Sequence, residues 1–417
     1  MPSQLEGSLA VARTVARCRP EVVCAYPITP QTHIVEALSR MVAGGELAPC
    51  EFVNVESELA AMSVAIGACA AGARAYTATA SQGLLYMAEA LFNAAGLGLP
   101  VVMTVANRAI GAPINIWNDH SDAMALRDCG WVQLYATSNQ EAADMHVQAF
   151  RLAEQCSLPV MVCMDGFVLT HAFEPLELPE QQLVDEFLPP FRPRQLLDPA
   201  EPATIGALVG PEAFTEVRYL AHAKQMEALD AIPVLASEFE SRLGRASGGL
   251  LGPYRCEDAH TVVIALGSVL GTLEEVIDER RARGAGIGAL AVKSYRPFPD
   301  AELRAALAGV SKVVVLERAF SVGRGGIVSG DVLAALAGRE LELHTVVAGL
   351  GGRAITRASL HRLLDDLDGG RLARLEFLDL ERDVVERELE RGRVHQRPGP
   401  HAESILRELG IVSAGPI

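Results

Sequence analysis

Residues 52–79, FVNVESELAAMSVAIGACAAGARAYTAT, contain the pattern that decides the fold. Short apolar runs at 52–55 and 75–79 have the length of buried strands. Between them, apolar residues recur at spacings of three, four and seven positions and would form one stripe of a helix: Leu59, Met62, Ile66 and Cys69. Strand, helix and strand in this order predict parallel strands with a helix packed on their sheet.

The same alternation extends in both directions from this segment. Strand-like runs are expected at 22–26, 100–105, 132–135 and 159–164. Helical patterns lie between them, for example Ile34, Val35, Leu38, Met41 and Val42. Such alternation is typical of a doubly wound sheet with helices on both faces. The first 175 or so residues are therefore predicted to form one α/β domain.

A second, smaller α/β domain is predicted after a less regular region. Residues 174–259 contain several prolines and no clean periodicity, so we expect an extended connector with an irregular helical piece near 214–230. Further strands are then expected at 261–266, 287–292, 313–316 and 342–347, with helices from Leu273, after Pro299 and from Ile327. The predicted division is 1–240 for the first domain with its connector from about 175, 241–365 for the second, and 366–417 for a charged, surface-wrapping C-terminal arm.

Composition and charge exclude several classes of partner. The net charge of −16 opposes nucleic-acid binding, which depends on clustered Lys and Arg. Charged residues interrupt the long apolar runs, and the first residues, MPSQLE, lack the basic and apolar segments of a secretory signal. The sequence therefore predicts a cytoplasmic protein that binds neither nucleic acid nor membrane.

The eight cysteines are not spaced as metal ligands. Zinc and iron–sulfur sites use pairs such as C-x-x-C, and the chain has none. Most of these cysteines lie within apolar strands or helices, where a thiol behaves as a small hydrophobic group. We therefore expect buried, unligated thiols.

The segment Tyr26-Pro27-Ile28-Thr29-Pro30 ends the first strand. Ligands of open α/β sheets bind outside the carboxyl ends of the strands, so the Thr29 hydroxyl would lie where a substrate is expected. The two prolines would stiffen the turn that holds it. A simple strand-ending turn before a helix explains the same residues, and spacing alone favours that interpretation.

The segment Glu56-Ser57-Glu58 stands at the start of the helix in the opening segment. A carboxylate at a helix N-terminus is ordinarily a cap. The alternative is a buried carboxylate that faces a nitrogen of a heterocycle. Neighbouring residues do not decide between the two.

Arg108 follows the apolar run that ends at Val105. A guanidinium at that place can bind a carboxylate, although a surface salt bridge is the commoner use. Asp119, His120 and Asp122 follow closely, but nothing in their spacing makes them converge on a metal ion. No metal ligand is expected in this chain.

Six motifs of the first domain occur in the order found in the α subunit of pyruvate and related 2-oxoacid:ferredoxin oxidoreductases. They are Tyr26-Pro27-Ile28-Thr29-Pro30, Glu56-Ser57-Glu58, Ala80-Ser81-Gln82-Gly83-Leu84, Asn107-Arg108-Ala109, Ile116-Trp117-Asn118-Asp119-His120-Ser121-Asp122 and Asp165-Gly166-Phe167. The likeness continues through Tyr295-Arg296-Pro297-Phe298-Pro299 and Leu316-Glu317-Arg318. Six ordered motifs are specific, whereas each alone would be weak. The chain therefore resembles this family, which includes the α subunit of pyruvate synthase, and it is also similar to the α subunit of NADH-dependent phenylglyoxylate dehydrogenase.

The resemblance implies a fold and a set of site residues. The first domain would have the thiamine diphosphate-binding fold of the pyrimidine type, and the second would be similar to the transketolase C-terminal domain. Glu58 would hydrogen-bond N1′ of the aminopyrimidine and favour the imino tautomer, which removes the proton from thiazolium C2. Arg108 and Thr29 would bind the substrate carboxylate and 2-oxo group, and Pro27 would line the ring with Thr29. Catalysis would thus rest on Glu58, Arg108 and Thr29.

The resemblance also implies that the active site is completed by other chains. The Gly-Asp-Gly motif that anchors the diphosphate and magnesium in thiamine enzymes is absent from this sequence. A β subunit would hold the diphosphate, magnesium and a 4Fe-4S cluster, a ferredoxin-like subunit would carry further clusters, and a γ subunit would serve the coenzyme A step. An NAD-linked enzyme would add a flavoprotein subunit that reduces NAD.

The implied reaction is the coenzyme A-dependent oxidative decarboxylation of a 2-oxoacid to acyl-CoA and carbon dioxide. Electrons would pass to ferredoxin or NAD through the clusters of partner subunits. Thr29 argues against the oxalate-type variant, which carries a cation at that position. Pyruvate, branched-chain 2-oxoacids and phenylglyoxylate stay open as substrates. A transketolase-like transferase without electron transfer and a non-catalytic scaffold are the alternatives.

Overall fold

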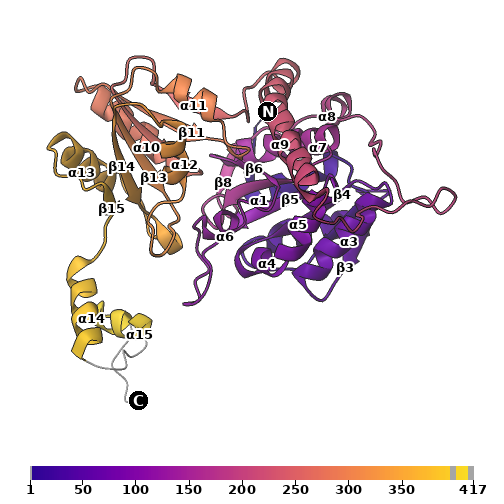
Figure 1. Cartoon of the computed structure of the whole chain (residues 1–417), viewed down its shortest axis with the longest axis horizontal. Helices are drawn as coiled ribbons and strands as arrows, with labels where there is room; N and C mark the ends of the chain where they lie inside the picture. Colours follow the sequence, from indigo (N-terminus) through magenta and orange to yellow (C-terminus); the bar gives the residue numbers. More distant parts are fainter. Residues whose placement is uncertain (1, 395–400, 412–417) are drawn as a thin grey trace.

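The computed structural model describes residues 2–394 and 401–411. Two α/β lobes lie side by side, and a short helical arm leaves the second lobe near the C-terminus (Figure 1). The first lobe contains the N-terminal half of the chain and the long helix α9. The mixed α/β fold with mainly parallel sheets confirms the fold class predicted from the sequence.

The first lobe is built on a seven-stranded sheet in the order β12-β6-β7-β5-β4-β2-β3. Its pairs are parallel except for β12 with β6. The strands are β2 (Val22–Ala25), β3 (Glu51–Asn54), β4 (Ala75–Thr79), β5 (Val102–Asn107), β6 (Val132–Tyr135), β7 (Val160–Asp165) and β12 (Ser294–Arg296). The chain runs outward from β2 to β3 and in the other direction from β4 to β5. The carboxyl ends of β2 and β4 therefore border the switch point where open α/β sheets bind ligands.

Helices cover both faces of this sheet because each has an apolar stripe. Those on one face bury Val11, Ile34 and Phe150, and those on the other bury Met62, Leu84 and Leu91. The helices of the lobe are α1 (Gly7–Arg17), α2 (Thr32–Ala43), α3 (Glu58–Ala70), α4 (Ser81–Tyr86), α5 (Ala88–Gly96), α6 (Ser121–Ala125), α7 (Asn139–Cys156), α8 (Gln181–Phe187) and α9 (Phe214–Leu243). A separate antiparallel pair joins β1 (Ser3–Glu6) to β8 (Phe173–Leu176).

The second lobe is built on a six-stranded sheet in the order β15-β14-β13-β10-β11-β9. Only β9 with β11 is antiparallel among its pairs in the described residues. The strands are β9 (Leu251–Tyr254), β10 (Thr261–Ala265), β11 (Ile287–Val292), β13 (Lys312–Glu317), β14 (Glu342–Val347) and β15 (Leu375–Phe377). The helices are α10 (Val269–Arg281), α11 (Asp300–Ala306), α12 (Val328–Ala335), the 3₁₀ turn η1 (Leu350–Gly352) and α13 (Arg357–Asp368).

The two lobes share a hydrophobic core. One cluster of buried side chains includes Met62 and Trp131 of the first lobe together with Val262 and Leu290 of the second. β12 follows three strands of the second sheet in the chain, β9, β10 and β11, yet it pairs with β6 of the first. The lobes are therefore packed against each other, which lets residues of the second lobe reach the loops at the edge of the first sheet.

The strand and helix alternation predicted from the sequence is present, and the structure differs from the prediction at α9 and at five short strands that were not expected: β1, β8, β9, β12 and β15. The irregular piece expected near 214–230 is part of one 30-residue helix, α9, which runs through Pro233. Its apolar pattern is weak because the buried side chains lie only in its second half, from Ala228 to Phe239. β12 was not expected, because three residues carry no periodicity. The predicted domain boundaries stay a prediction; α13 and β15 extend the second lobe to Phe377.

The C-terminal arm and the cysteines complete the description. The sequence predicted an arm that wraps the surface. The helices α14 (Arg382–Val394) and α15 (His401–Glu408) instead stand off the second lobe (Figure 1), so the described part of the arm does not wrap it. Residues 395–400 and 412–417 of the predicted arm lie outside the described residues. Within the described ranges, no helix combines the length and apolarity needed to cross a membrane. All eight cysteines are free thiols, six of them buried.

Candidate functional site

The predicted site residues lie where strands of the first sheet end. Pro27 and Thr29 follow β2, Glu58 follows β3, and Arg108 follows β5. Pro27 and Thr29 are exposed, whereas the Glu58 and Arg108 residues are each 8% exposed. Because parallel strands end at the same edge of a sheet, all four are near the switch point between β2 and β4.

Arg108 is held in contact with Thr29. Its Nη1 donates a hydrogen bond to the Thr29 carbonyl oxygen at 2.9 Å, and its Nε donates to the Asn115 carbonyl oxygen at 3.0 Å. Burial lowers the pKa of the guanidinium, and the nearby Asp122 carboxyl works in the opposite direction. Only two of the five guanidinium N–H groups bind these carbonyls, so others remain to bind a carboxylate.

The helix cap at α3 is Ser57, and the Glu58 carboxylate takes no part in it. The Ser57 hydroxyl oxygen accepts a hydrogen bond from the Ala60 N–H at 3.2 Å, as an N-cap does. No hydrogen bond or ion pair to the Glu58 carboxylate is found within the described ranges. A buried acidic group without a partner is uncommon in folded proteins, because desolvation is costly. Glu58 lies in the first turn of α3, where a negative charge is favourable to the helix dipole, but Ser57 and not Glu58 is the N-cap.

Gly83 lies directly against Glu58. A Cβ atom at position 83 would be 2.6 Å from Glu58 Oε1 and 2.6 Å from Thr79 Oγ1. The Thr79 hydroxyl is buried and has no hydrogen-bond partner among the described residues. Two polar groups without partners, Glu58 and Thr79, thus border one place that a side chain at position 83 would fill. We refer to Glu58, Thr79 and Gly83 as the carboxylate cradle.

Asp122 connects the cradle to Arg108. Its carboxylate accepts hydrogen bonds from the Ser81 N–H at 2.9 Å and the Arg108 N–H at 3.0 Å. The Asn107 side-chain amide and the Ala123 N–H also donate to it. Burial raises the pKa of Asp122 to about 6, against the effect of these four donors. One carboxylate therefore fixes both the start of α4, which carries Gly83, and the backbone of Arg108.

The residues from Asn115 to His120 bind the second lobe. The Asn115 side-chain amide donates to the Gly351 carbonyl oxygen at 3.1 Å, and the Gly351 N–H donates to Asp119 Oδ2 at 3.1 Å. The His120 N–H donates to the Arg318 carbonyl oxygen at 3.0 Å. Asp119, His120 and Asp122 thus bind different partners within the protein.

Asp165, at the end of β7, is the centre of a buried polar cluster between the lobes. Its Oδ1 is 2.7 Å from His120 Nε2, and its Oδ2 is 2.7 Å from Arg318 Nη1. The Ser268 N–H donates to Oδ2 at 2.8 Å, and the Ser268 hydroxyl also donates to it. Burial would raise the pKa of Asp165, but the charges of Arg318 and His120 and the hydrogen bonds from His120 and Ser268 hold it well below its usual range. We call Asp165, His120, Ser268 and Arg318 the Asp165 cluster.

Sequence reasoning assigned no role to several residues of this region. Gly83, Asp122, Asp165 and Arg318 were quoted within motifs of the resemblance, and Thr79 was noted only as the end of a strand. The motifs themselves were the available signal. The contacts that define the roles join residues far apart in the chain, so no local pattern could have shown them.

One group of side chains in the described ranges has the composition of a metal site. Ligand atoms of Glu6, His33 and His171 lie within 4.8 Å of one another. His33 Nδ1 is 2.5 Å from Glu6 Oε1, and the rings of His33 and His171 stack with centroids 4.7 Å apart. These contacts explain the group without an ion, and the absence of metal ligands from this chain stays a prediction.

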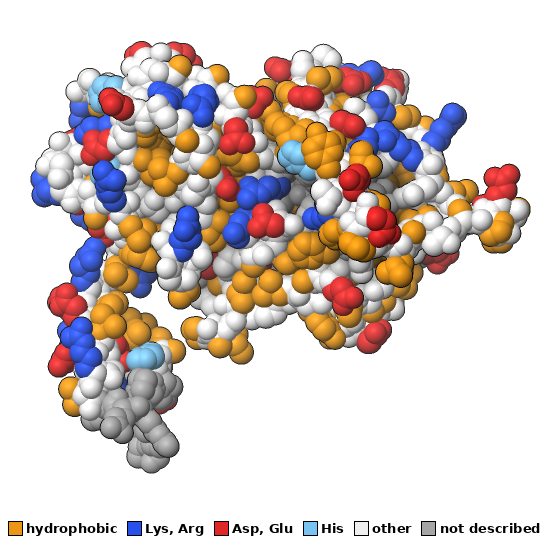
Figure 2. Space-filling model, viewed as in Figure 1, with side chains coloured by type: hydrophobic (Ala, Val, Ile, Leu, Met, Phe, Trp, Pro, Cys, Tyr) orange, Lys and Arg blue, Asp and Glu red, His pale blue; other side chains and the backbone are white. Residues whose placement is uncertain are grey.

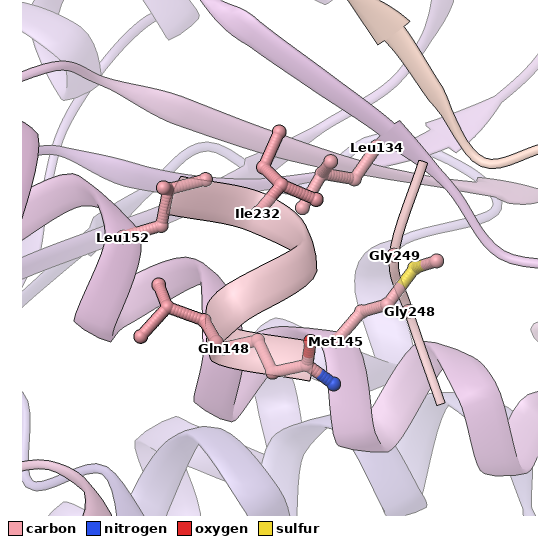
Figure 3. A pocket seen from close by; sticks show the side chains of 8 residues that line it. Leu134, Met145, Gln148, Leu152, Ile232, Gly248 and Gly249 are labelled. Carbon is pink, nitrogen blue, oxygen red and sulfur yellow. The ribbon is translucent and has the colours of Figure 1, made fainter. Parts of the chain in front are cut away.

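The cavity drawn in Figure 3 is a different place from the predicted site. It lies between α7, α9 and the chain at 248–249, and its labelled side chains are almost all apolar. The one polar side chain, Gln148, donates its amide hydrogen to the Ser247 carbonyl oxygen at 3.0 Å. The cavity holds no titratable side chain and none of the predicted site residues, so it is a packing gap beside the sheet.

The surface near the predicted site is apolar. Large side chains there are exposed to 38% at Tyr26, 59% at Tyr86, 47% at Phe92 and 52% at Trp117. Figure 2 shows hydrophobic side chains gathered on the face that α4 and the neighbouring loops form. Contiguous apolar surface beside polar groups is typical of a protein interface.

Comparison with known families and relatives agrees with this geometry. Residues 13–235 match the family model described as pyruvate flavodoxin/ferredoxin oxidoreductase, thiamine diphosphate-binding, and residues 259–360 match pyruvate:ferredoxin oxidoreductase core domain II. The pyruvate synthase subunit PorA of Methanosarcina barkeri is 48% identical over 390 residues, which cover 91% of this chain and 97% of the relative. The ketoisovalerate oxidoreductase subunit VorA of Pyrococcus abyssi is 39% identical, and the match covers 91% of this chain and 98% of the relative.

Among solved structures, the 2-oxoglutarate:ferredoxin oxidoreductase from Magnetococcus marinus, with 2-oxoglutarate, coenzyme A and succinyl-CoA bound, has a similar fold. The TM-score is 0.69 at 21% identity, and the match covers 88% of this chain. This chain spans 65% of that chain's length. The structural match shows the fold, whereas the family models and the relatives confirm the resemblance first noted from the ordered motifs: the chain belongs to the pyruvate flavodoxin/ferredoxin oxidoreductase family.

Proposed function

We propose that this chain is the α subunit of a pyruvate-type 2-oxoacid:ferredoxin oxidoreductase and binds the aminopyrimidine end of thiamine diphosphate. The observation that carries the proposal is Glu58, a residue only 8% exposed, whose carboxylate lies against Gly83 and has no hydrogen bond or ion pair in the described chain. The reaction would be the coenzyme A-dependent oxidative decarboxylation of a 2-oxoacid to acyl-CoA and carbon dioxide.

The carboxylate cradle fits the polar edge of an aminopyrimidine. An aminopyrimidine offers its ring nitrogen to the Glu58 carboxyl and its exocyclic amine, as a donor, to a hydroxyl such as that of Thr79. The Thr79 hydroxyl is buried without a partner in the described chain. A glycine at position 83 leaves the room that a flat ring needs, since a Cβ there would contact both oxygens. Pro27, exposed in the turn after β2, would line the same ring.

Thiamine diphosphate, when bound, would supply the carbon nucleophile and the electron sink for decarboxylation. The residues of this chain would supply orientation and proton control. Glu58 would hydrogen-bond N1′ and so hold the proton there that favours the imino tautomer. Arg108 would bind the substrate carboxylate with the N–H groups that Thr29 and Asn115 leave free, and the Thr29 hydroxyl would bind the 2-oxo oxygen.

Other chains would complete the site. The sequence has no Gly-Asp-Gly motif for the diphosphate and magnesium and no cysteine pattern for a 4Fe-4S cluster. The apolar surface near Tyr86 and Trp117 supports the presence of a partner subunit at this edge. A β subunit would provide these groups, a ferredoxin-like subunit would carry electrons, and a γ subunit would serve the coenzyme A step.

Pyruvate is the best-supported substrate. The relatives named pyruvate synthase subunit PorA are 42–48% identical to this chain, and the ketoisovalerate subunit VorA is 39% identical. A branched-chain 2-oxoacid is therefore the second candidate. Phenylglyoxylate with NAD, the further option considered from the sequence, has no support of this kind.

The test is to isolate the enzyme with its co-purifying subunits and measure coenzyme A-dependent reduction. Pyruvate, 2-oxoisovalerate and phenylglyoxylate are each supplied with ferredoxin or with NAD as the acceptor. We expect pyruvate with ferredoxin to give the largest kcat/KM. A preference for another acid would reassign the substrate, whereas an enzyme that contains no iron and reduces neither acceptor with any of the three would refute the proposed function and favour a transferase.

A further inference from the structure

Two motifs of the first lobe and one of the second are not explained by direct contact with cofactor or substrate. They are the segment from Trp117 to Asp122, the segment Asp165-Gly166-Phe167, and Leu316-Glu317-Arg318. In the fold, these motifs meet at one place, because Asp165 contacts both His120 and Arg318. Their shared position indicates one role for all three.

The Asp165 cluster is buried and closely packed. Asp165, His120 and Arg318 are 1%, 2% and 9% exposed. A Cβ atom at Gly267 would be 2.9 Å from Asp165 Oδ2 and 3.1 Å from His120 Nε2, so the backbone of the second lobe approaches the carboxylate as nearly as it can. Removing one partner of a buried ion pair leaves the other charge desolvated and unpaired, which is strongly destabilising. The cluster therefore holds the two lobes together at this place.

A continuous run of contacts leads from this cluster to Arg108. His120 is bound by Asp165 through its side chain and by the Arg318 carbonyl through its N–H. Two positions further along the chain, in α6, Asp122 accepts a hydrogen bond from the Arg108 N–H. The second lobe, which contributes no predicted site residue, is thus connected to the arginine through three consecutive positions, 120–122.

The loop between Arg108 and His120 is tied at its middle as well. The Ala109 N–H donates to the Trp117 carbonyl oxygen at 3.0 Å and closes the loop on itself. Asn115 accepts the Arg108 Nε–H at its carbonyl and donates its side-chain amide to Gly351 of the second lobe. The guanidinium of Arg108 therefore rests on a loop whose position the second lobe sets at Gly351 and Arg318.

We propose that the second lobe positions the substrate-binding arginine, and that Asp165 is the positioning residue that transmits this support through His120 to the 108–122 segment. The proposal rests on the proposed function of Arg108. It differs from a purely structural link between lobes, which would stabilise the fold and leave the arginine unaffected. Asp165 touches neither cofactor nor substrate in this scheme.

The test compares three variants of the isolated enzyme. Asp165→Asn keeps the shape of the side chain and removes its charge, and Ser268→Ala removes one hydroxyl donor to Asp165 and leaves its ion pairs intact. The matched control is Asp185→Asn, since Asp185 also pairs with an arginine, Arg19, but on the surface of the same lobe. The readouts are hydrogen–deuterium exchange of amides 108–118, and KM and kcat for the 2-oxoacid and for coenzyme A.

We expect faster exchange of amides 108–118 in Asp165→Asn, by about tenfold, and a smaller change of the same sign in Ser268→Ala. KM for the 2-oxoacid should rise about tenfold in Asp165→Asn, with KM for coenzyme A unchanged, and the control should match the wild type in both readouts. The magnitudes follow from charged hydrogen bonds, whose loss changes an equilibrium by roughly tenfold or more.

Exchange at 108–118 that matches the wild type in both Asp165→Asn and Ser268→Ala would overturn the proposal. If Asp165→Asn does not assemble, Ser268→Ala decides by the same readout. Exchange does not depend on turnover, so a failure of the proposed function leaves this test standing. Faster exchange with an unchanged KM for the 2-oxoacid would also reject a positioning role in binding.

Discussion

Two buried carboxylates at the same edge of the first sheet have opposite surroundings. Asp165, which ends β7, is bound by the guanidinium of Arg318, the ring of His120, and the N–H and hydroxyl of Ser268. Glu58, just beyond β3, has no hydrogen bond or ion pair among residues 2–394 and 401–411. Leaving an acidic side chain without a partner at a mostly buried position is costly. Because Asp165 is paired and Glu58 is not, we infer that the two residues have different roles.

The difference separates a residue that receives a ligand from one that holds the structure around it. A saturated carboxylate such as Asp165 has no remaining capacity to bind another molecule. The Glu58 carboxylate has that capacity, and Thr79 beside it shares this property. Asp122 stands between the two cases, because four N–H donors bind it and none of the groups that donate to it is a charged side-chain group.

The largest expected effect is that of Glu58→Gln, which keeps the size of the side chain and removes its charge. Loss of proton control at N1′ should lower kcat by about 1,000-fold, within the range of general acid–base catalysis. In the cofactor-depleted enzyme, where Glu58 has no partner, the melting temperature should stay the same or rise, because an unpaired charge at a mostly buried position is removed. Steady-state assays and thermal unfolding measure the two effects.

The control for this substitution is Glu56→Gln, two residues away and exposed, which should behave as the wild type. Asp165→Asn should do the reverse of Glu58→Gln in thermal unfolding and lower the melting temperature, because it leaves Arg318 without its carboxylate. A Glu58→Gln variant that melts earlier and turns over normally would break the comparison and return Glu58 to a structural role.

The next effect in size is that of Arg108→Lys. Lysine keeps the charge and loses the planar donors that bind the Thr29 and Asn115 carbonyls. We expect kcat/KM for the 2-oxoacid to fall by roughly 30-fold to 100-fold, mainly through KM, as for a charged hydrogen bond. The control is Arg127→Lys, whose guanidinium binds only the Met124 carbonyl and a neighbouring carboxylate. An unchanged KM for the 2-oxoacid would mean that another group binds the substrate carboxylate.

A smaller effect is expected from Gly83→Ala, which tests directly whether the space beside Glu58 holds the cofactor. The added Cβ would lie 2.6 Å from Glu58 Oε1, where the proposed ring has to fit. The dissociation constant for thiamine diphosphate, titrated into the cofactor-depleted enzyme, should rise about tenfold, as for a loss of about 1.4 kcal/mol. Gly96→Ala is the matched control, since nothing lies within 4 Å of a Cβ there. Equal affinities in the two variants would place the cofactor elsewhere.

The sequence predicted one side of this comparison better than the other. Local apolar periodicity was enough for most of the alternating strands and helices. The rule that ligands bind at strand ends made Thr29 a candidate, but spacing alone favoured a simple turn there, and the roles of Thr29 and Arg108 came from the resemblance. The resemblance added Glu58. The Asp165 cluster could not be predicted, because Asp165 and Arg318 are 153 positions apart and the contact depends on how the two lobes pack. The first half of α9 is exposed for the most part and so carries no apolar stripe.

The last prediction concerns Asp122, the intermediate case, and it is a dependence of stability on pH and not a change in activity. Burial raises the pKa of Asp122 to about 6 in the folded chain, from an ordinary value of 3.8. Between these values the folded state holds a proton that the unfolded state has lost, so the contribution of Asp122 to stability decreases as pH rises from about 4 to 6 and is constant above that.

The total change is about 3 kcal/mol, at 1.36 kcal/mol for each unit of pKa. The measurement is the difference in melting temperature between the wild type and Asp122→Asn across this range. Asparagine does not titrate, so the effect of the substitution itself on stability is the same at every pH. The melting temperature of the wild type should therefore fall relative to that of the variant as pH rises. A melting temperature of the wild type that rises relative to the variant would show that the four N–H donors lower the pKa of Asp122 more than burial raises it. Asp122 would then resemble Asp165, whose pKa its cationic partners lower.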